Sequence, residues 1–320
     1  MKIFIIGAGR WGSLIAYYLD TLKHDVTLYG PADTEHMKQF LATRKNSLLT
    51  LPESIRLSTD ISDARDADII LISVPSQVLR TVAKELSELG LGKRIYVLCM
   101  KGIEIASGKR LSEVMTEYIS PDSSVAVWIG PGHVQEFYRG IPNCMVIDSA
   151  NEETKDTLIK AFTGPLIRFY YGQDLIGNEI GAAAKNVIGI AAGVLDGLGL
   201  SSLKGALMSR GTREVARLIK AMGGNELSAY GLCHLGDYEA TVFSQYSHNR
   251  AFGESFAKGE KFDESKLAEG YYTADAMHRL AKKYGVELPI AEAVYSMLYE
   301  NADPATALRA LFDRSLKKEF

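Results

Sequence analysis

Cysteine is scarce in this chain of 320 residues, which contains only Cys99, Cys144 and Cys233. An odd number of widely spaced cysteines excludes a disulfide framework as the basis of the fold, so we predict free thiols. The six histidines show neither H-x-x-x-H nor H-E-x-x-H spacing, and the cysteines are not clustered. We therefore predict that the protein binds no metal.

The sequence also lacks a large charge of either sign and a long hydrophobic run. The net charge is −3 with 23% charged residues, so no basic excess points to nucleic acid. No stretch reaches the roughly 18 consecutive apolar residues of a membrane span. Glycines and Arg10 interrupt the apolar N-terminus too early for a signal peptide. We expect a cytoplasmic protein with no nucleic-acid partner and no membrane span.

Two domains are expected from the length of the chain and from a change of pattern along it. Short apolar runs at residues 2–6, 26–29, 69–74, 95–100 and 125–129 alternate with helical segments, which predicts an α/β fold with a parallel, Rossmann-type doubly wound sheet. After about residue 176 only helical periodicity continues. We predict a dinucleotide-binding domain over residues 1–177 and an all-helical C-terminal domain over residues 178–320.

The first apolar run leads into a glycine fingerprint, Gly7-Ala8-Gly9-Arg10-Trp11-Gly12, followed by an amphipathic segment. In this pattern the first glycine makes the tight turn, the second lets the backbone approach a diphosphate, and the third permits close helix packing. The N-terminus of the following helix favours the phosphate charge. The fingerprint predicts dinucleotide binding, with a simple glycine turn as the alternative.

The usual signal that separates NAD from NADP is absent. An acidic residue at the end of the second strand would hold the ribose hydroxyl, but Tyr29 is followed by Gly30-Pro31-Ala32. Arg10, Arg44 or Lys45 could approach a 2′-phosphate instead. The sequence leaves NAD or NADP open and leans towards NADP or both.

A lysine stands in an almost entirely small or apolar segment at residues 179–200, where Lys185 is followed by Asn186. Lysine is seldom buried without a partner, so this lysine should face a partner or a ligand cavity. The glycines at 181, 189 and 193 have helical spacing from it and are equally explained by close helix packing. Lys101 follows the strand at 95–100, where ligands bind in doubly wound sheets.

Taken together, the motifs GAGRWG, VPSQVLR, KGIE, AAAKNVIGIAAGVLDGLGL, HLGDY, SHNRAFG and AEG resemble the bacterial NAD(P)-dependent glycerol-3-phosphate dehydrogenases over nearly the whole chain. The resemblance implies an oxidoreductase that interconverts dihydroxyacetone phosphate and sn-glycerol 3-phosphate with NAD(P)H and feeds glycerophospholipid synthesis. It also implies a homodimer.

Residue roles follow from the same resemblance, position by position. Lys185 matches the catalytic lysine, Lys101 a second active-site lysine, and Asp237 the substrate-site aspartate. Further substrate contacts are implied at Gly130, Asn186, Ser247, His248, Asn249 and Arg250. Cofactor contacts are implied at Gly7, Gly9, Arg10, Trp11, Gly12, Pro75, Val134 and Glu269. We expect Lys185 to donate a proton to the substrate carbonyl, because burial and Lys101 would both lower its pKa towards neutrality.

Two departures from the family pattern concern the substrate. The family's S-R-N reads Ser247-His248-Asn249, so a histidine replaces the arginine that the resemblance assigns to the substrate phosphate; Arg250 could substitute for it. The family's G-P-S/T-F-A loop also has Gly132 and His133 in its third and fourth positions. Two alternatives therefore stay open: a related dehydrogenase for another small hydroxy or keto substrate, and a non-catalytic dinucleotide sensor.

Overall fold

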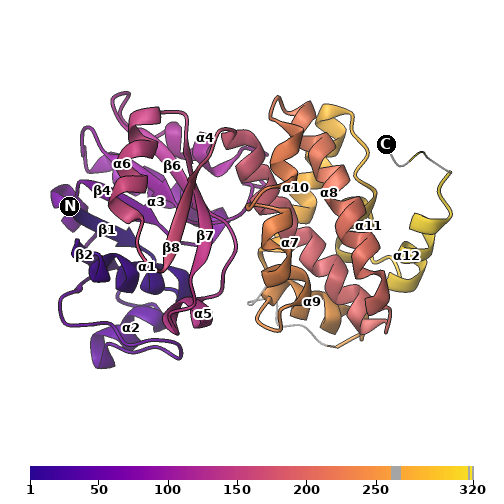
Figure 1. Ribbon diagram of the computed structural model, residues 1–320, viewed down its shortest axis with the longest axis horizontal. Helices are drawn as coiled ribbons and strands as arrows, with labels where there is room; N and C mark the ends of the chain where they lie inside the picture. Colours follow the sequence, from indigo (N-terminus) through magenta and orange to yellow (C-terminus); the bar gives the residue numbers. More distant parts are fainter. Residues whose placement is uncertain (261–267, 316–317, 319–320) are drawn as a thin grey trace.

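The computed structural model describes residues 1–260, 268–315 and 318. Figure 1 shows a sheet with helices against it, built from the first half of the chain, beside a body made of helices. The last sheet strand ends at Tyr171 and the first helix of the second body begins at Leu175. The sheet-containing part and the helical part thus follow one another along the chain, as the pattern predicts.

Within the described residues, the sheet has eight strands in the order β3-β2-β1-β4-β5-β6-β7-β8. The strand β1 lies inside it, because Ile3 pairs with Val26 on one side and with Ile69 on the other. The strands are β1 (Lys2–Ile6), β2 (Asp25–Tyr29), β3 (Arg56–Ser58), β4 (Ile69–Ile72), β5 (Ile95–Leu98), β6 (Ser124–Ile129), β7 (Asn143–Ser149) and β8 (Ile167–Tyr171).

The five predicted strands and their parallel alignment are confirmed, but the prediction missed β3, β7 and β8, and with β7 included the sheet is not entirely parallel. The strand β7 runs antiparallel to β6. A parallel neighbour needs a connection that returns along the strand, usually as a helix. The helix between them, α5 (Val134–Tyr138), has five residues, so it covers about 7.5 Å at about 1.5 Å per residue. It is too short to carry the chain back along β6.

The remaining helices of the first half lie against this sheet. They are α1 (Arg10–Thr21), α2 (Glu35–Thr43), α3 (Leu79–Glu88), α4 (Leu111–Thr116) and α6 (Glu152–Phe162). The second half contains α7 (Leu175–Gly197), α8 (Lys204–Ala221), α9 (His248–Ala257), α10 (Glu269–Tyr284), α11 (Pro289–Tyr299) and α12 (Pro304–Phe312).

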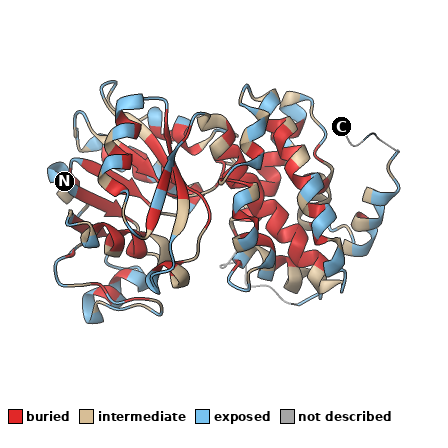
Figure 2. Cartoon of the chain, viewed as in Figure 1, coloured by how far each residue is buried: buried red, intermediate tan, exposed pale blue. Residues whose placement is uncertain are grey.

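The long helix α7 is the core of the helical part, and Figure 2 shows it almost entirely in the colour of buried residues. By length and composition it could also cross a membrane, but 83% of its most apolar window is buried inside the fold. The core helix of a globular protein passes the same test, so this feature is weak evidence for a span.

Two glycines let α7 and α9 pack backbone against backbone. A Cβ on Gly193 would lie 1.9 Å from the carbonyl oxygen of Arg250, and one on Gly253 would lie 2.1 Å from that of Ile190. The packing explanation for Gly193 is therefore confirmed. Close contact of these helices also brings Asn249, at the start of α9, to Asn186 in the middle of α7.

We predict that Gly193→Ala destabilises the protein by about 3 kcal/mol, since backbone atoms cannot move away from the added methyl group. The matched control is Gly205→Ala, an exposed position in α8 where a Cβ meets nothing within 4 Å. This control should be neutral or more stable by up to about 1 kcal/mol. Urea unfolding measures both; equal stability of the two variants would contradict the close packing.

Candidate active site

The glycine loop between β1 and α1 has the geometry that its sequence predicts. Gly7 has φ +114°, and a Cβ there would lie 2.2 Å from the carbonyl oxygen of Ser73. A Cβ on Gly12 would lie 1.9 Å from the carbonyl oxygen of Gly7, whereas one on Gly9 would meet nothing within 4 Å. The open side at Gly9, together with the N-terminus of α1 that no side chain caps, fits the diphosphate of a dinucleotide.

Trp11 and Val134 lie in α1 and α5, two helices that pack together. Val134 is buried at the start of α5, and the Trp11 ring lies 5.9 Å from the ring of Phe137 in the same helix. Both cofactor-side predictions therefore fall on the two helices that meet at the contact of Trp11 with Phe137.

Glu269 joins the two halves of the chain on the other side of the site. Its carboxylate accepts hydrogen bonds from the backbone N of Ser76 at 2.9 Å and from the Ser76 hydroxyl at 2.5 Å. Ser76 follows Pro75 just beyond β4, and Glu269 is the first residue of α10. Burial raises the pKa of the Glu269 carboxyl above its ordinary value. Pro75 and Glu269, both predicted on the cofactor side, are thereby brought together.

Three charged side chains meet at the junction of the two halves. Lys185 Nζ lies 3.1 Å from Asp237 Oδ2, and Lys101 Nζ lies 2.6 Å from the same oxygen. The Asp237 side chain is 0% exposed and that of Lys185 is 11% exposed. Lys101 Nζ also donates to the carbonyl oxygen of Gly130 at 2.6 Å. The structure thus brings together the lysines and the aspartate that the sequence analysis singled out.

Lys185 is poised to exchange a proton near neutral pH. Burial lowers its pKa from the ordinary 10.5 to about 8, with Asp237 acting in the opposite direction and Lys101 lowering it further. Below about pH 8 the side chain is mainly the ammonium form that can give a proton. Above it the neutral amine, which can take one, predominates.

Two buried polar atoms in this region have no hydrogen-bond partner among the described residues: Oδ1 of Asp237 and Nε2 of His133. A buried acceptor without a partner costs about 1–3 kcal/mol, and more when it is charged. His133 is electrostatically coupled to Asp237, Lys185 and Lys101, and burial lowers its pKa. These atoms are suited to bind polar groups of a ligand.

Gly132 precedes His133 with φ +138°, and a Cβ there would lie 2.2 Å from the Phe137 ring. Because Phe137 occupies this space, the hydroxyl residue that the family pattern has at this position does not fit here.

Asn186 and Asn249 form a chain of amide hydrogen bonds behind the lysines. The backbone N of Gly270 donates to Asn249 Oδ1 at 2.8 Å, and Asn249 Nδ2 donates to Asn186 Oδ1 at 3.1 Å. Asn186 Nδ2 in turn donates to the carbonyl oxygen of Lys101 at 3.2 Å. The chain fixes the backbone of Lys101 relative to α7 and α10.

The first turn of α9 carries the other predicted substrate residues. Ser247 is the N-cap and accepts a hydrogen bond from the backbone N of Arg250 at 3.3 Å. His248 Nε2 lies 2.7 Å from Nη1 of Arg10, the first residue of α1. Partial desolvation and the Arg10 guanidinium lower the pKa of His248, which favours the neutral ring as the acceptor.

Arg250 does not reach the lysines. Its Nε donates to Asp196 Oδ2 at 2.7 Å, near the end of α7. Asp196 follows Lys185 by eleven residues, roughly 16 Å along the helix axis at about 1.5 Å per residue. We therefore remove Arg250 from the candidate site, since its guanidinium is committed to an ion pair elsewhere.

Sequence reasoning missed Thr241. Its hydroxyl accepts a hydrogen bond from Lys185 Nζ at 2.8 Å, and the residue is fully buried in the π-helical turn Glu239–Phe243. Thr241 follows Asp237 by four residues, and this spacing places two side chains on one face of a helical turn. This four-residue spacing from Asp237 could have identified Thr241 as a site residue from the sequence.

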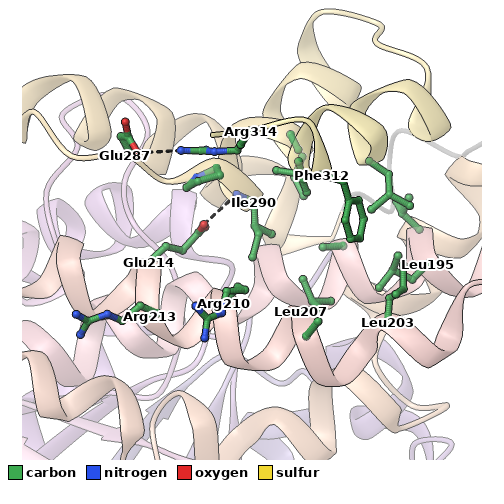
Figure 3. A pocket seen from close by; sticks show the side chains of 18 of the residues that line it. Leu195, Leu203, Leu207, Arg210, Arg213, Glu214, Glu287, Ile290, Phe312 and Arg314 are labelled. Carbon is green, nitrogen blue, oxygen red and sulfur yellow. Dashed lines mark hydrogen bonds and ion pairs between the residues drawn. The ribbon is translucent and has the colours of Figure 1, made fainter. Parts of the chain in front are cut away.

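A separate cavity of about 770 Å³ lies between α7, α8, α11 and α12 (Figure 3). Its lining is mostly apolar and includes Leu195, Leu207 and Ile290. Glu214 in its wall accepts hydrogen bonds from the backbone N of Ile290 and of Ala291, so it stabilises the start of α11. None of the lining residues belongs to the lysine cluster, so we place the active site at the junction and not in this cavity.

Comparisons with known proteins agree along the whole chain. Residues 2–155 match the family model described as NAD-dependent glycerol-3-phosphate dehydrogenase N-terminus, and residues 174–309 match the corresponding C-terminus. A relative from Thermoanaerobacter sp. named glycerol-3-phosphate dehydrogenase [NAD(P)+] is 36% identical, covering 100% of this chain and 99% of its own.

Another relative with the same name, from Exiguobacterium sp., is 38% identical over 99% of this chain and 97% of its own. The crystal structure of glycerol-3-phosphate dehydrogenase from Coxiella burnetii superposes with a TM-score of 0.90 at 30% identity, covering 98% of this chain and 99% of that one.

We predict that Thr241→Val lowers the pKa of Lys185 below about 8, since the hydrogen bond that favours the ammonium form is lost. Thr241→Ser keeps the hydroxyl and should leave the titration unchanged. The measurement is an NMR titration of the lysine side chains from pH 6 to 10, with Lys185 assigned through Lys185→Arg. An identical Lys185 midpoint in the valine and serine variants would show that the hydroxyl does not act on the amine.

Proposed function

The chain belongs to the NAD-dependent glycerol-3-phosphate dehydrogenase family, and from this we propose that it catalyses the reversible reduction of dihydroxyacetone phosphate to sn-glycerol 3-phosphate with NADH or NADPH. The observation that carries the proposal is the cluster of Lys101, Lys185 and the buried Asp237 at the junction with the dinucleotide-binding fold. A protein that only sensed a dinucleotide would not need two lysines paired with one buried carboxylate.

The residues around the glycine loop fit the cofactor. Gly7, Gly9 and Gly12 and the start of α1 would hold its diphosphate, and Pro75 and Glu269 would lie towards its nicotinamide end. When bound, NAD(P)H supplies the hydride that reduces the carbonyl carbon. The chain itself has to position the substrate and move one proton.

Lys185 is the proton donor in this proposal. The Lys185 ammonium would give its proton to the substrate oxygen, which becomes the hydroxyl when the carbonyl carbon is reduced. In the reverse direction the neutral amine removes that proton. A pKa of about 8 makes both forms accessible near neutral pH.

Asp237 and Lys101 would orient the substrate. Oδ2 of Asp237 is shared between the two ammonium groups, which leaves Oδ1 free to accept a hydrogen bond from the substrate's hydroxyl. The Lys101 ammonium has three donors and uses two of them on Gly130 and Asp237, so one remains for a substrate oxygen.

The choice between NAD and NADP stays a prediction. The Arg44 guanidinium donates to the carbonyl oxygens of Pro52 and Ile55 at 2.6 and 2.5 Å, which weakens its case as a 2′-phosphate ligand. The lean towards NADP or both rests on the missing acidic residue after Tyr29. The cytoplasmic location, the homodimer and the domain boundary at residue 177 likewise stay predictions.

We expect Lys185→Met to lower kcat for dihydroxyacetone phosphate reduction by about 10²–10⁴-fold, the usual contribution of a positioned acid. Nucleotide binding should persist, because the glycine loop is unchanged. Steady-state NADH and NADPH oxidation measures kcat, and quenching of cofactor fluorescence measures nucleotide binding.

The matched control is Lys204→Met. Lys204 is also a buried lysine paired with a carboxylate, Asp196 at 2.7 Å, but lies outside the cluster. The Lys204→Met variant should retain turnover at temperatures at which it is folded. Full turnover by Lys185→Met would remove this residue from the chemistry, whereas a wild type that turns over only phosphate-free substrates would favour the related dehydrogenase.

A further inference from the structure

The contact between Arg10 and His248 joins two helix N-termini from opposite halves of the chain. Arg10 is the first residue of α1 and His248 the first residue of α9, and Nη1 and Nε2 lie 2.7 Å apart. His248 is followed by Asn249, whose amide is bonded to Asn186 beside Lys185. The contact therefore lies at the edge of the lysine site, next to the glycine loop.

The charges at this point are not balanced by the protein. A helix N-terminus carries about half a positive charge, so acidic residues are favoured there and a guanidinium is not. Neither α1 nor α9 has an acidic residue in its first turn. In the described part of the chain no carboxylate pairs with Arg10, whereas Arg80, Arg110 and Arg250 all pair with carboxylates. Arg56 and Arg65 also lack a carboxylate partner in this part of the chain, but they donate to a hydroxyl and a carbonyl oxygen, whereas the partner of Arg10 is a histidine that already lies at another helix N-terminus. An anion would balance the positive charge here.

The neutral His248 ring holds Arg10 without neutralising it. Since the guanidinium cannot accept a hydrogen bond, Nε2 is the acceptor, and the proton of the neutral ring is then on Nδ1. Arg10 has five N–H donors in a planar fork and spends one of them on His248. The others can bind a tetrahedral oxyanion in the bidentate manner that histidine cannot provide.

We propose that Arg10, oriented by His248, binds a phosphate group at the edge of the lysine site and supplies from the glycine loop the guanidinium that position 248 lacks. The inference rests on the proposed function for the nature of the ligand. The phosphate belongs either to dihydroxyacetone phosphate or to the cofactor diphosphate, and the chemistry at Arg10 is the same for both.

The test compares wild type with Arg10→Ser and with the double variant Arg10→Ser/His248→Arg. Serine is a suitable residue for a helix N-terminus, so the loop should keep its fold. Calorimetry measures the Kd of sn-glycerol 3-phosphate with cofactor present and the Kd of NADH alone. Arg10→Ser should weaken one of these by about 10- to 100-fold, as expected for a hydrogen bond to a charged group.

The double variant should recover most of the lost affinity, because its guanidinium reaches the same phosphate from α9. Arg10→Lys, which keeps the charge without the fork, should fall between wild type and Arg10→Ser. The control is Arg56→Ser: this arginine of β3 donates to Thr27 and should change neither Kd.

The two dissociation constants identify which phosphate Arg10 binds. A weaker Kd for sn-glycerol 3-phosphate, together with less preference for dihydroxyacetone phosphate over dihydroxyacetone, assigns Arg10 to the substrate. A weaker Kd for NADH assigns it to the diphosphate. If both constants stay at wild-type values in Arg10→Ser, the proposal is wrong. A wild type that binds NADH but not sn-glycerol 3-phosphate would instead contradict the proposed function. The proposal for Arg10 would then be tested by the Kd of NADH in Arg10→Ser alone.

Discussion

A single carboxylate oxygen, Oδ2 of Asp237, holds the site together because it contacts the ammonium groups of both Lys185 and Lys101. Lys101 follows a strand of the sheet, whereas Lys185 and Asp237 belong to the helical half. The contact therefore pairs opposite charges and also joins the two halves of the chain. Removing one partner of such a buried cluster leaves an uncompensated charge, which costs about 3–5 kcal/mol. Position and protonation of the reacting lysine thus depend on the same oxygen.

The rest of the junction keeps this oxygen in place. The close contact of α7 and α9 at Gly193 sets Asn249 beside Asn186, and the amide chain extends from there to the backbone of Lys101. Glu269 adds a second tie through Ser76. Because each link is a directional hydrogen bond or a backbone contact, the geometry tolerates little displacement, which suits a site that must align a proton donor.

Local patterns in the sequence predicted much of this arrangement. The glycine fingerprint and the lysine in an apolar helix can be recognised from neighbouring residues alone, and both lie where expected. The reversed strand β7, the Thr241 contact and the pairing of Arg10 with His248 depend on how distant segments meet. Arg250 shows the same limit of reasoning from neighbouring residues. It follows His248 by two positions, but its side chain contacts Asp196, because its place on the helix directs it there.

The central claim is that burial makes Lys185 an acid that works near neutral pH. Its most direct test is the pH dependence of kcat/KM for dihydroxyacetone phosphate reduction from pH 6 to 10, in wild type and in Asp237→Asn. The protonated lysine is the active form, so the wild-type rate should fall as pH rises through about 8. Loss of the Asp237 charge should move that fall to lower pH. A wild-type rate that stays constant to pH 10, or a fall that moves to higher pH in Asp237→Asn, would contradict the account.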